Sequence, residues 1–150
     1  MPATNIGVRT HERYGLPSFL RRSLLANAAF SGLSGLVFIF GASPISHHLG
    51  LDDPIALVVV GVSLVFYALG LAHNARRPAV SLIETRVAIA LDVLWVIGSA
   101  GLILTGLLSA TANWVVAILA DLVLVFAICQ FIGLRRVERA RPSGSTVRQA

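Results

Sequence analysis

Two carboxylic acids lie inside long apolar runs of this 150-residue chain. Asp92 stands in the middle of "IALDVLWVIG", and Asp121 stands in "AILADLVLVF". A charged side chain at the centre of a membrane-spanning helix costs about 2.5 to 3.5 kcal/mol on insertion scales. No Arg or Lys lies inside these runs to pair with either acid. We therefore expect Asp92 and Asp121 to be protonated at neutral pH, unless water reaches them, and to bond to neutral polar neighbours.

Other polar side chains fall at matching depths if the apolar runs are helices. Since an α-helix rises about 1.5 Å per residue, two of them lie with Asp92 roughly 6 to 9 Å inside the arginine-rich boundary, and three lie with Asp121 near the bilayer middle. Spacings of three and four residues place Asn27, Ser31 and Ser34 on one helical face. We predict an inward-facing polar cluster, which is also a candidate proton-binding site: Asp92, Asp121, Asn27, Tyr67, Ser34, Ser63 and Ser99.

A segment after the first apolar run contains side chains of metal-binding types. His47, His48, Asp52 and Asp53 qualify by type, but adjacent histidines point in different directions and no further ligand pattern converges on them. We interpret this segment as a solvated loop. The sequence also lacks a Gly-rich phosphate loop, a nucleophile elbow and an HExxH motif. We expect no metal, no cofactor, no catalytic residue and no enzymatic activity.

The composition indicates which elements must position these residues. Hydrophobic residues make up 56% of the chain and charged residues only 13%, whereas soluble domains carry about a quarter charged residues. The apolar residues fall in four runs of the length that crosses a bilayer, about 20 residues each. These runs predict an all-α fold, a polytopic bundle of four transmembrane helices at about 23–42, 55–72, 87–107 and 114–134. The first run is too long for a signal peptide and is expected to remain as a span.

The arginines predict the orientation of the bundle. All 12 basic residues are Arg, and they lie before the first run, between the second and third, and after the fourth. The positive-inside rule then places both termini in the cytoplasm, with a cytoplasmic segment at 1–22 and a basic tail at 135–150. The first dozen residues and the stretch from Arg141 are polar and expected to be loose. Because the arginines mark the ends of spans, we expect the bilayer as partner, together with a possible homodimer or membrane-protein partner, and no nucleic acid.

Local signals mark helix ends and close contacts. Asp53-Pro54 is typical of a helix start, and Ser81 followed by Glu84 is a capping box. Cys129 is expected to be a small packing residue. Several glycines could let helix backbones approach closely. They are Gly32, Gly35, Gly61, Gly98 and Gly101.

The two halves of the chain resemble each other. Each is a predicted helical hairpin with a polar residue early in its first helix, Asn27 in one half and Asp92 in the other. Their second helices carry "LVFYALGLAHNARR" and "LVFAICQFIGLRR". Because each half has an even number of spans, the repeats would be parallel. Low-complexity apolar sequence also imitates itself, so chance similarity remains the alternative.

The segments "GASPISHHLGL", "FYALGLAHNARRP" and "ALDVLWVIGSAGLIL" carry a family resemblance. In the pattern of these segments, the chain resembles small four-span integral membrane proteins of bacteria over most of residues 20 to 137. The resemblance implies a multi-pass protein of the inner (plasma) membrane and nothing about activity. Small multidrug exporters also have four spans, but they rely on an acid in the first helix, where this sequence has Asn27.

Two functions follow from these patterns. The first is a membrane scaffold, accessory subunit or partner-binding module, in which the polar residues fasten the helices together. The alternative is a small proton-coupled transporter or channel that uses Asp92 and Asp121 as a relay, since acids inside membranes mark proton routes.

Overall fold

A computed structural model describes residues 8–49 and 53–140 of the chain, with side chains at 18–48 and 53–140. These residues form helices joined by short connections and contain no strand, which confirms the all-α fold. The helices are α1 (Val8–Phe40), α2 (Ala42–Leu49), α3 (Ile55–Arg76), α4 (Leu82–Leu104) and α5 (Ala110–Ala140).

Four of the helices are long and apolar enough to cross a membrane. The spans lie at Ser18–Phe40, Ile55–Arg76, Leu82–Leu104 and Ala110–Ala140. The sequence predicts the same four elements, because continuous apolar runs of this length are the strongest structural signal in a chain. The architecture is that of a multi-pass helical membrane protein.

The predicted helix ends differ from the observed ones where polar residues continue a helix beyond the apolar run. Helix α1 begins at Val8, so part of the first dozen residues, predicted to be loose, is helical. Helix α5 continues to Ala140, past the predicted end of the fourth span. His47 and His48 of the histidine segment belong to the short helix α2 and not to a loop. Hydropathy reports the apolar length of a helix, while its hydrogen bonds continue into the polar flanks. The stretch from Arg141 lies outside the described residues.

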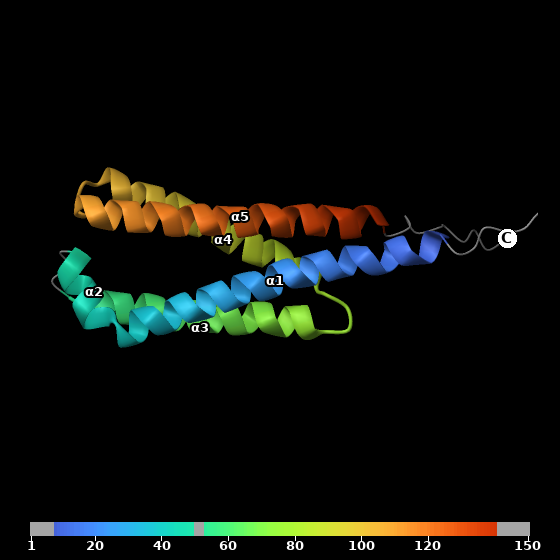
Figure 1. The fold of residues 1–150 in the computed structure, drawn as a ribbon, viewed down its shortest axis with the longest axis horizontal. Helices are drawn as coiled ribbons and strands as arrows, with labels where there is room; N and C mark the ends of the chain where they lie inside the picture. Colours follow the sequence, from blue (N-terminus) through green and yellow to red (C-terminus); the bar gives the residue numbers. More distant parts are fainter. Residues whose placement is uncertain (1–7, 50–52, 141–150) are drawn as a thin grey trace, which may run out of the picture.

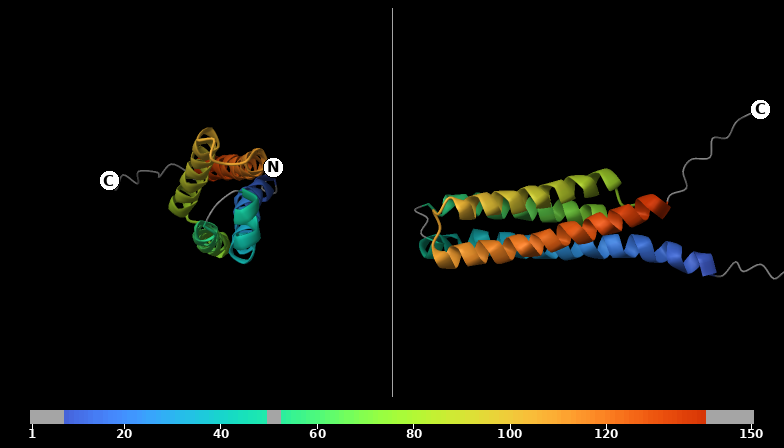
Figure 2. Two further views of the ribbon diagram at one scale, coloured as in Figure 1. Left: turned by 90° about the vertical axis from the view of Figure 1, so that its left-hand side faces the viewer. Right: turned by 90° about the horizontal axis from the view of Figure 1, so that it is seen from above.

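The helices form two hairpins that pack side by side. Figure 1 shows α1 running along α3 in one hairpin and α4 along α5 in the other, with the start of α1 and the end of α5 at the same end of the bundle. The two hairpins also meet directly, through contacts between α1 and α5. Seen along the bundle in Figure 2, the four spans occupy the corners of a square. Helices α1 and α4 run in the same direction, as parallel repeats require, although the duplication itself stays a prediction.

Two glycines let the backbones of α1 and α3 approach closely within their hairpin. A Cβ atom added to Gly35 would lie 2.7 Å from the carbonyl oxygen of Gly61, and one added to Gly61 would lie 2.7 Å from the oxygen of Gly35. Each glycine therefore gives room to the backbone of the other helix. Gly98 and Gly101, predicted to do the same, have nothing within 4 Å and lie on the exposed side of α4. The prediction of close approach is confirmed at Gly35 and Gly61 and wrong at these two positions in the single chain.

The connection between α3 and α4 is built around a buried amide. The side-chain oxygen of Asn74 accepts a hydrogen bond from Ser81 N at 2.8 Å, and its nitrogen donates to Thr85 Oγ1 at 3.2 Å. Ser81 caps α4 by accepting from Glu84 N, which confirms the predicted helix start. The return bond of a capping box is not formed, because Ser81 N donates to Asn74 and the Glu84 carboxylate pairs with Arg77. At the start of α3, Asp53 Oδ1 accepts from the N–H of Ile55 at 2.8 Å, in line with its predicted role at a helix start.

The apolar core lies at the arginine-rich end of the bundle. Leu20, Leu24 and Ala28 of α1 pack there against α3 and against Ala88 of α4. This core lies beside the polar side chains that form the candidate site.

Candidate functional site

Four polar side chains meet inside the bundle, one from each span. Asp92 of α4 is at the centre and accepts a hydrogen bond from each of the other three. Asn27 Nδ2 of α1 donates to its Oδ2 at 2.8 Å, and Gln130 Nε2 of α5 donates to the same oxygen at 3.1 Å. Tyr67 Oη of α3 donates to Oδ1 at 2.7 Å. We call Asn27, Tyr67, Asp92 and Gln130 the four-helix cluster.

The four-helix cluster is buried except at Tyr67, which is partly exposed. Asn27 and Gln130 are completely buried, and Asp92 is 3% exposed. Helical spacing explains this burial on α4, where Thr85, Ala88 and Asp92 are also buried and share one face at spacings of three and four. No Arg, Lys or His bonds to the Asp92 carboxyl group within the described part of the chain. The acid is therefore held by neutral donors alone.

The groups around Asp92 can form hydrogen bonds with both the ionised and the protonated form of its carboxyl group. When the carboxylate is ionised, Tyr67 donates its hydroxyl proton to Oδ1. When Oδ1 carries a proton, it can donate to the Tyr67 oxygen, and Tyr67 can turn its own proton toward the carbonyl oxygen of Ala88, 3.2 Å away. The two amides donate to Oδ2 in either state, since amide N–H groups act only as donors. One proton can thus bind without breaking the cluster apart.

Gln130 was not singled out in the sequence, although it makes one of the three bonds to Asp92. A signal for it exists in α5, where Ala120, Ala127 and Gln130 are all buried at helical spacing. A polar residue on the small-residue face of a span is expected to turn inward, because small residues mark helix contacts in membranes. Its Oε1 is buried and has no hydrogen-bond partner in the described part of the chain, where this amide is held on one side only.

The structure brings together only part of the predicted cluster. Asn27, Tyr67 and Asp92 join, and Ser31 extends the network by donating to Asn27 Oδ1 at 3.1 Å. Ser99 is buried on α4, in line with the prediction, but within the described residues it makes no hydrogen bond to the four-helix cluster. The prediction of a shared inward layer is thus confirmed at the depth of Asp92.

The second predicted layer is not formed. Asp121 lies on the exposed side of α5 and has no hydrogen bond or ion pair within residues 18–48 and 53–140. It is nine positions from Gln130, which at 100° per residue is half a turn away, so the two residues occupy opposite faces. Ser63 is exposed and its hydroxyl donates to Val59 O of its own helix, while Ser34 lies beside an apolar groove. The prediction that Asp121 and Ser63 face the interior is wrong for the single chain.

The histidine segment gathers no metal site among the described residues. His47 and His48 project from α2, and the ring of His48 bonds at Nδ1 to the carbonyl oxygen of Pro44 at 2.8 Å. Asp53 is engaged at the start of α3. Asp52 lies outside the described residues.

Together, the fold and the site define a multi-pass helical membrane protein in which one buried acid is shared by all four spans. No protein-family model matches the chain, and comparisons with curated proteins and with solved structures give no significant match.

Proposed function

We propose that this protein is a membrane scaffold and partner-binding module. The observation that carries the proposal is the division of its two intramembrane acids: Asp92 is tied to all four helices, whereas Asp121 is presented on the outside of α5. The first arrangement supports a bundle of fixed register, because each of the other three spans contributes one donor to the carboxyl group of Asp92. The second leaves an acid on an exposed face of α5, which supports contact between that face and a partner protein.

Asp121 lies in the middle of an exposed stripe along α5. The stripe follows spacings of four and three residues, the pattern with which helices pack in left-handed coiled coils and most membrane bundles. Its members are all exposed: Trp114, Ile118, Asp121, Val125, Ile128 and Ile132. We call these residues the α5 stripe. Apolar members alone would suit lipid, but an acid within the membrane is expected to face protein or water.

The partner that we propose for the α5 stripe is the same stripe on a second copy of the chain. A twofold axis along the membrane normal would bring Asp121 against its own copy, so that one protonated acid could donate a hydrogen bond to the other. Symmetric pairing of one surface with itself is the commonest way in which proteins form oligomers. A polar residue in an otherwise apolar stripe would also fix the register of the pair.

Replacing Asp121 by leucine is expected to weaken this dimer by about three- to twentyfold, the range that follows from interhelical hydrogen bonds of about 0.6 to 1.7 kcal/mol in membranes. The dissociation constant can be measured by energy transfer between labelled chains in vesicles at increasing protein density. Ser63→Leu is the matched control, since Ser63 is also polar and exposed but lies on α3. A chain that is monomeric at every density, or an equal loss in the Ser63 variant, would exclude the proposal.

We place this module in the inner membrane of a bacterium with both termini in the cytoplasm. The support is the distribution of arginine, which is concentrated at one end of the bundle, together with the pattern resemblance to small four-span bacterial proteins.

A second candidate function is proton transfer through Asp92, favoured by the pair of hydrogen-bonding states open to Asp92 and Tyr67. The relay from Asp92 to Asp121 is not supported within one chain, since Asp121 faces away from the four-helix cluster. If the protein transports protons, Asp92→Asn should fold normally and abolish proton flux into liposomes, while Asp121→Asn should keep it. Absence of flux in the wild type under any imposed gradient would eliminate this candidate.

A further inference from the structure

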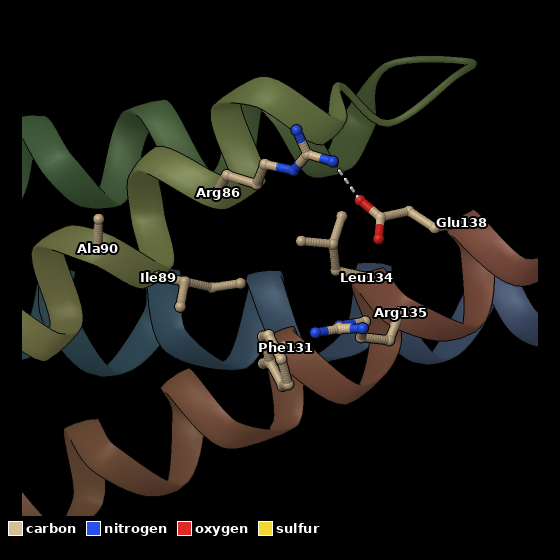
Figure 3. Close-up of a pocket in the computed structure, with 7 residues that line it drawn as sticks. All are labelled: Arg86, Ile89, Ala90, Phe131, Leu134, Arg135 and Glu138. Carbon is tan, nitrogen blue, oxygen red and sulfur yellow. Dashed lines mark hydrogen bonds and ion pairs between the residues drawn. The ribbon is translucent and has the colours of Figure 1, made fainter.

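A groove opens between α4 and α5 at the arginine-rich end of the bundle. Its volume is about 370 Å³, and its lining changes in character along its length. Toward the middle of the two helices it is apolar, and toward the arginine-rich end it is charged (Figure 3). The apolar part is formed by Ile89, Ala90, Phe131 and Leu134, and the charged part by Arg86, Arg135 and Glu138.

The charges of the groove are not balanced. Arg86 bonds to Glu138 at 2.6 Å, so one of the two guanidinium groups is already paired. Arg135 lies over the ring of Phe131, 5.0 Å from its centroid, and has no hydrogen bond or ion pair among the described residues. Figure 3 shows Leu134 between these two arginines. The charged part of the groove therefore carries one net positive charge next to the apolar part.

The position of these charges fits the boundary of a bilayer. Arg135 lies about 8 Å beyond Gln130 along α5, and Arg86 lies about 9 Å before Asp92 along α4, both toward the arginine-rich end. Basic pockets between transmembrane helices on this side of a membrane are known places for lipid headgroups, and guanidinium groups bind phosphate with paired N–H donors.

We propose that this groove binds one anionic phospholipid. The phosphate is held by Arg135, with Arg86 at the rim, and one acyl chain lies along Ile89, Ala90 and Phe131. A lipid with a single net negative charge neutralises the unpaired arginine and fills the apolar part at the same time. A soluble phosphate ion would leave the apolar part empty, which is why a lipid is the occupant that the lining favours. None of the residues that line the groove is a member of the α5 stripe, although Arg135 follows Ile132 by three positions on the same face of α5.

The test is a titration of the purified full-length chain in mild detergent with palmitoyl-oleoyl phosphatidylglycerol, with bound lipid counted by native mass spectrometry. Phosphatidylcholine with the same chains serves as the uncharged competitor. Wild type should retain one phosphatidylglycerol in preference to phosphatidylcholine. Arg135→Gln should weaken binding about fivefold, the contribution expected of one arginine near anionic lipid. Arg135→Lys, which keeps the charge, should lose less.

Arg136 provides the matched control. It stands next to Arg135 and also lies over an aromatic ring, that of Phe19 at 5.5 Å, but it does not line the groove. Arg136→Gln should leave the affinity unchanged. Ala90→Phe should fill the apolar part of the groove and weaken lipid binding without altering any charge. Circular dichroism should show unchanged helix content in all variants.

Three results would overturn the proposal. Equal binding of the two lipids by wild type would remove the role of the net charge. An equal loss in the variants of Arg135 and Arg136 would reduce the effect to general surface charge. Displacement of the lipid by inorganic phosphate at the same concentration would assign the site to a soluble anion.

Discussion

Replacing Asp92 by alanine is expected to lower the free energy of unfolding by about 2 to 5 kcal/mol, because three interhelical hydrogen bonds of about 0.6 to 1.7 kcal/mol each are lost together. The substitution also removes the acceptor of Gln130 Nε2 and leaves Asn27 Nδ2 with only a long bond of 3.5 Å to Tyr67 Oη, and an unpaired polar group in a buried position is costly. The unfolding equilibrium can be followed by circular dichroism as a denaturing detergent is added to the protein in mild micelles.

Asp121→Ala is the matched control for this measurement, since it makes the same change in the same kind of segment. Asp121 is exposed and has no bonding partner within the described part of the single chain, so its removal should leave the stability of the monomer unchanged or raise it. The comparison is made at low protein density, where any dimer is dissociated. A loss in Asp121→Ala equal to that in Asp92→Ala would contradict the assignment of Asp92 as the acid that joins the helices.

Replacing Gly35 by alanine is expected to destabilise the hairpin of α1 and α3 by about 1 to 3 kcal/mol, the usual effect of inserting a methyl group into a packed contact. The added Cβ would lie 2.7 Å from a backbone oxygen of Gly61, and backbone atoms cannot turn aside as a flexible side chain can. The two helices must therefore move apart. Thermal unfolding of the purified chain measures the loss.

Gly98→Ala isolates the effect of this contact from that of the glycine itself. A Cβ at Gly98 has nothing within 4 Å, and alanine favours a helix more than glycine does, so this variant should be as stable as wild type or more stable. The double variant of Gly35 and Gly61 should lose less than the two single losses added together, because one separation of the helices relieves both clashes. Strict additivity, or a stable Gly35→Ala variant, would show that the helices do not cross at these glycines.

The sequence determined the parts of this protein that depend on local composition. Four apolar runs are sufficient to define four spans, since a backbone in lipid must satisfy its own hydrogen bonds and a helix does so within one segment. The cap at Ser81 was readable for the same reason, because its bond joins residues three positions apart. The pairing of Asn27 with Asp92 was partly accessible, as both fall at one depth of the membrane when counted along straight helices.

Which side of each helix faces inward follows only from the packing of the helices in the tertiary structure. Depth follows from counting residues, but rotation about the helix axis depends on which neighbour each face meets, and apolar sequence is compatible with lipid on any side. Asp121 and Gln130 show the difference, since both are polar residues of α5 and lie half a turn apart. Gln130 shares its face with small alanines that let another helix approach, whereas Asp121 shares its face with large residues such as Ile118 and Val125. Packing between the helices, and not polarity alone, therefore determines that Gln130 meets Asp92 and that Asp121 does not.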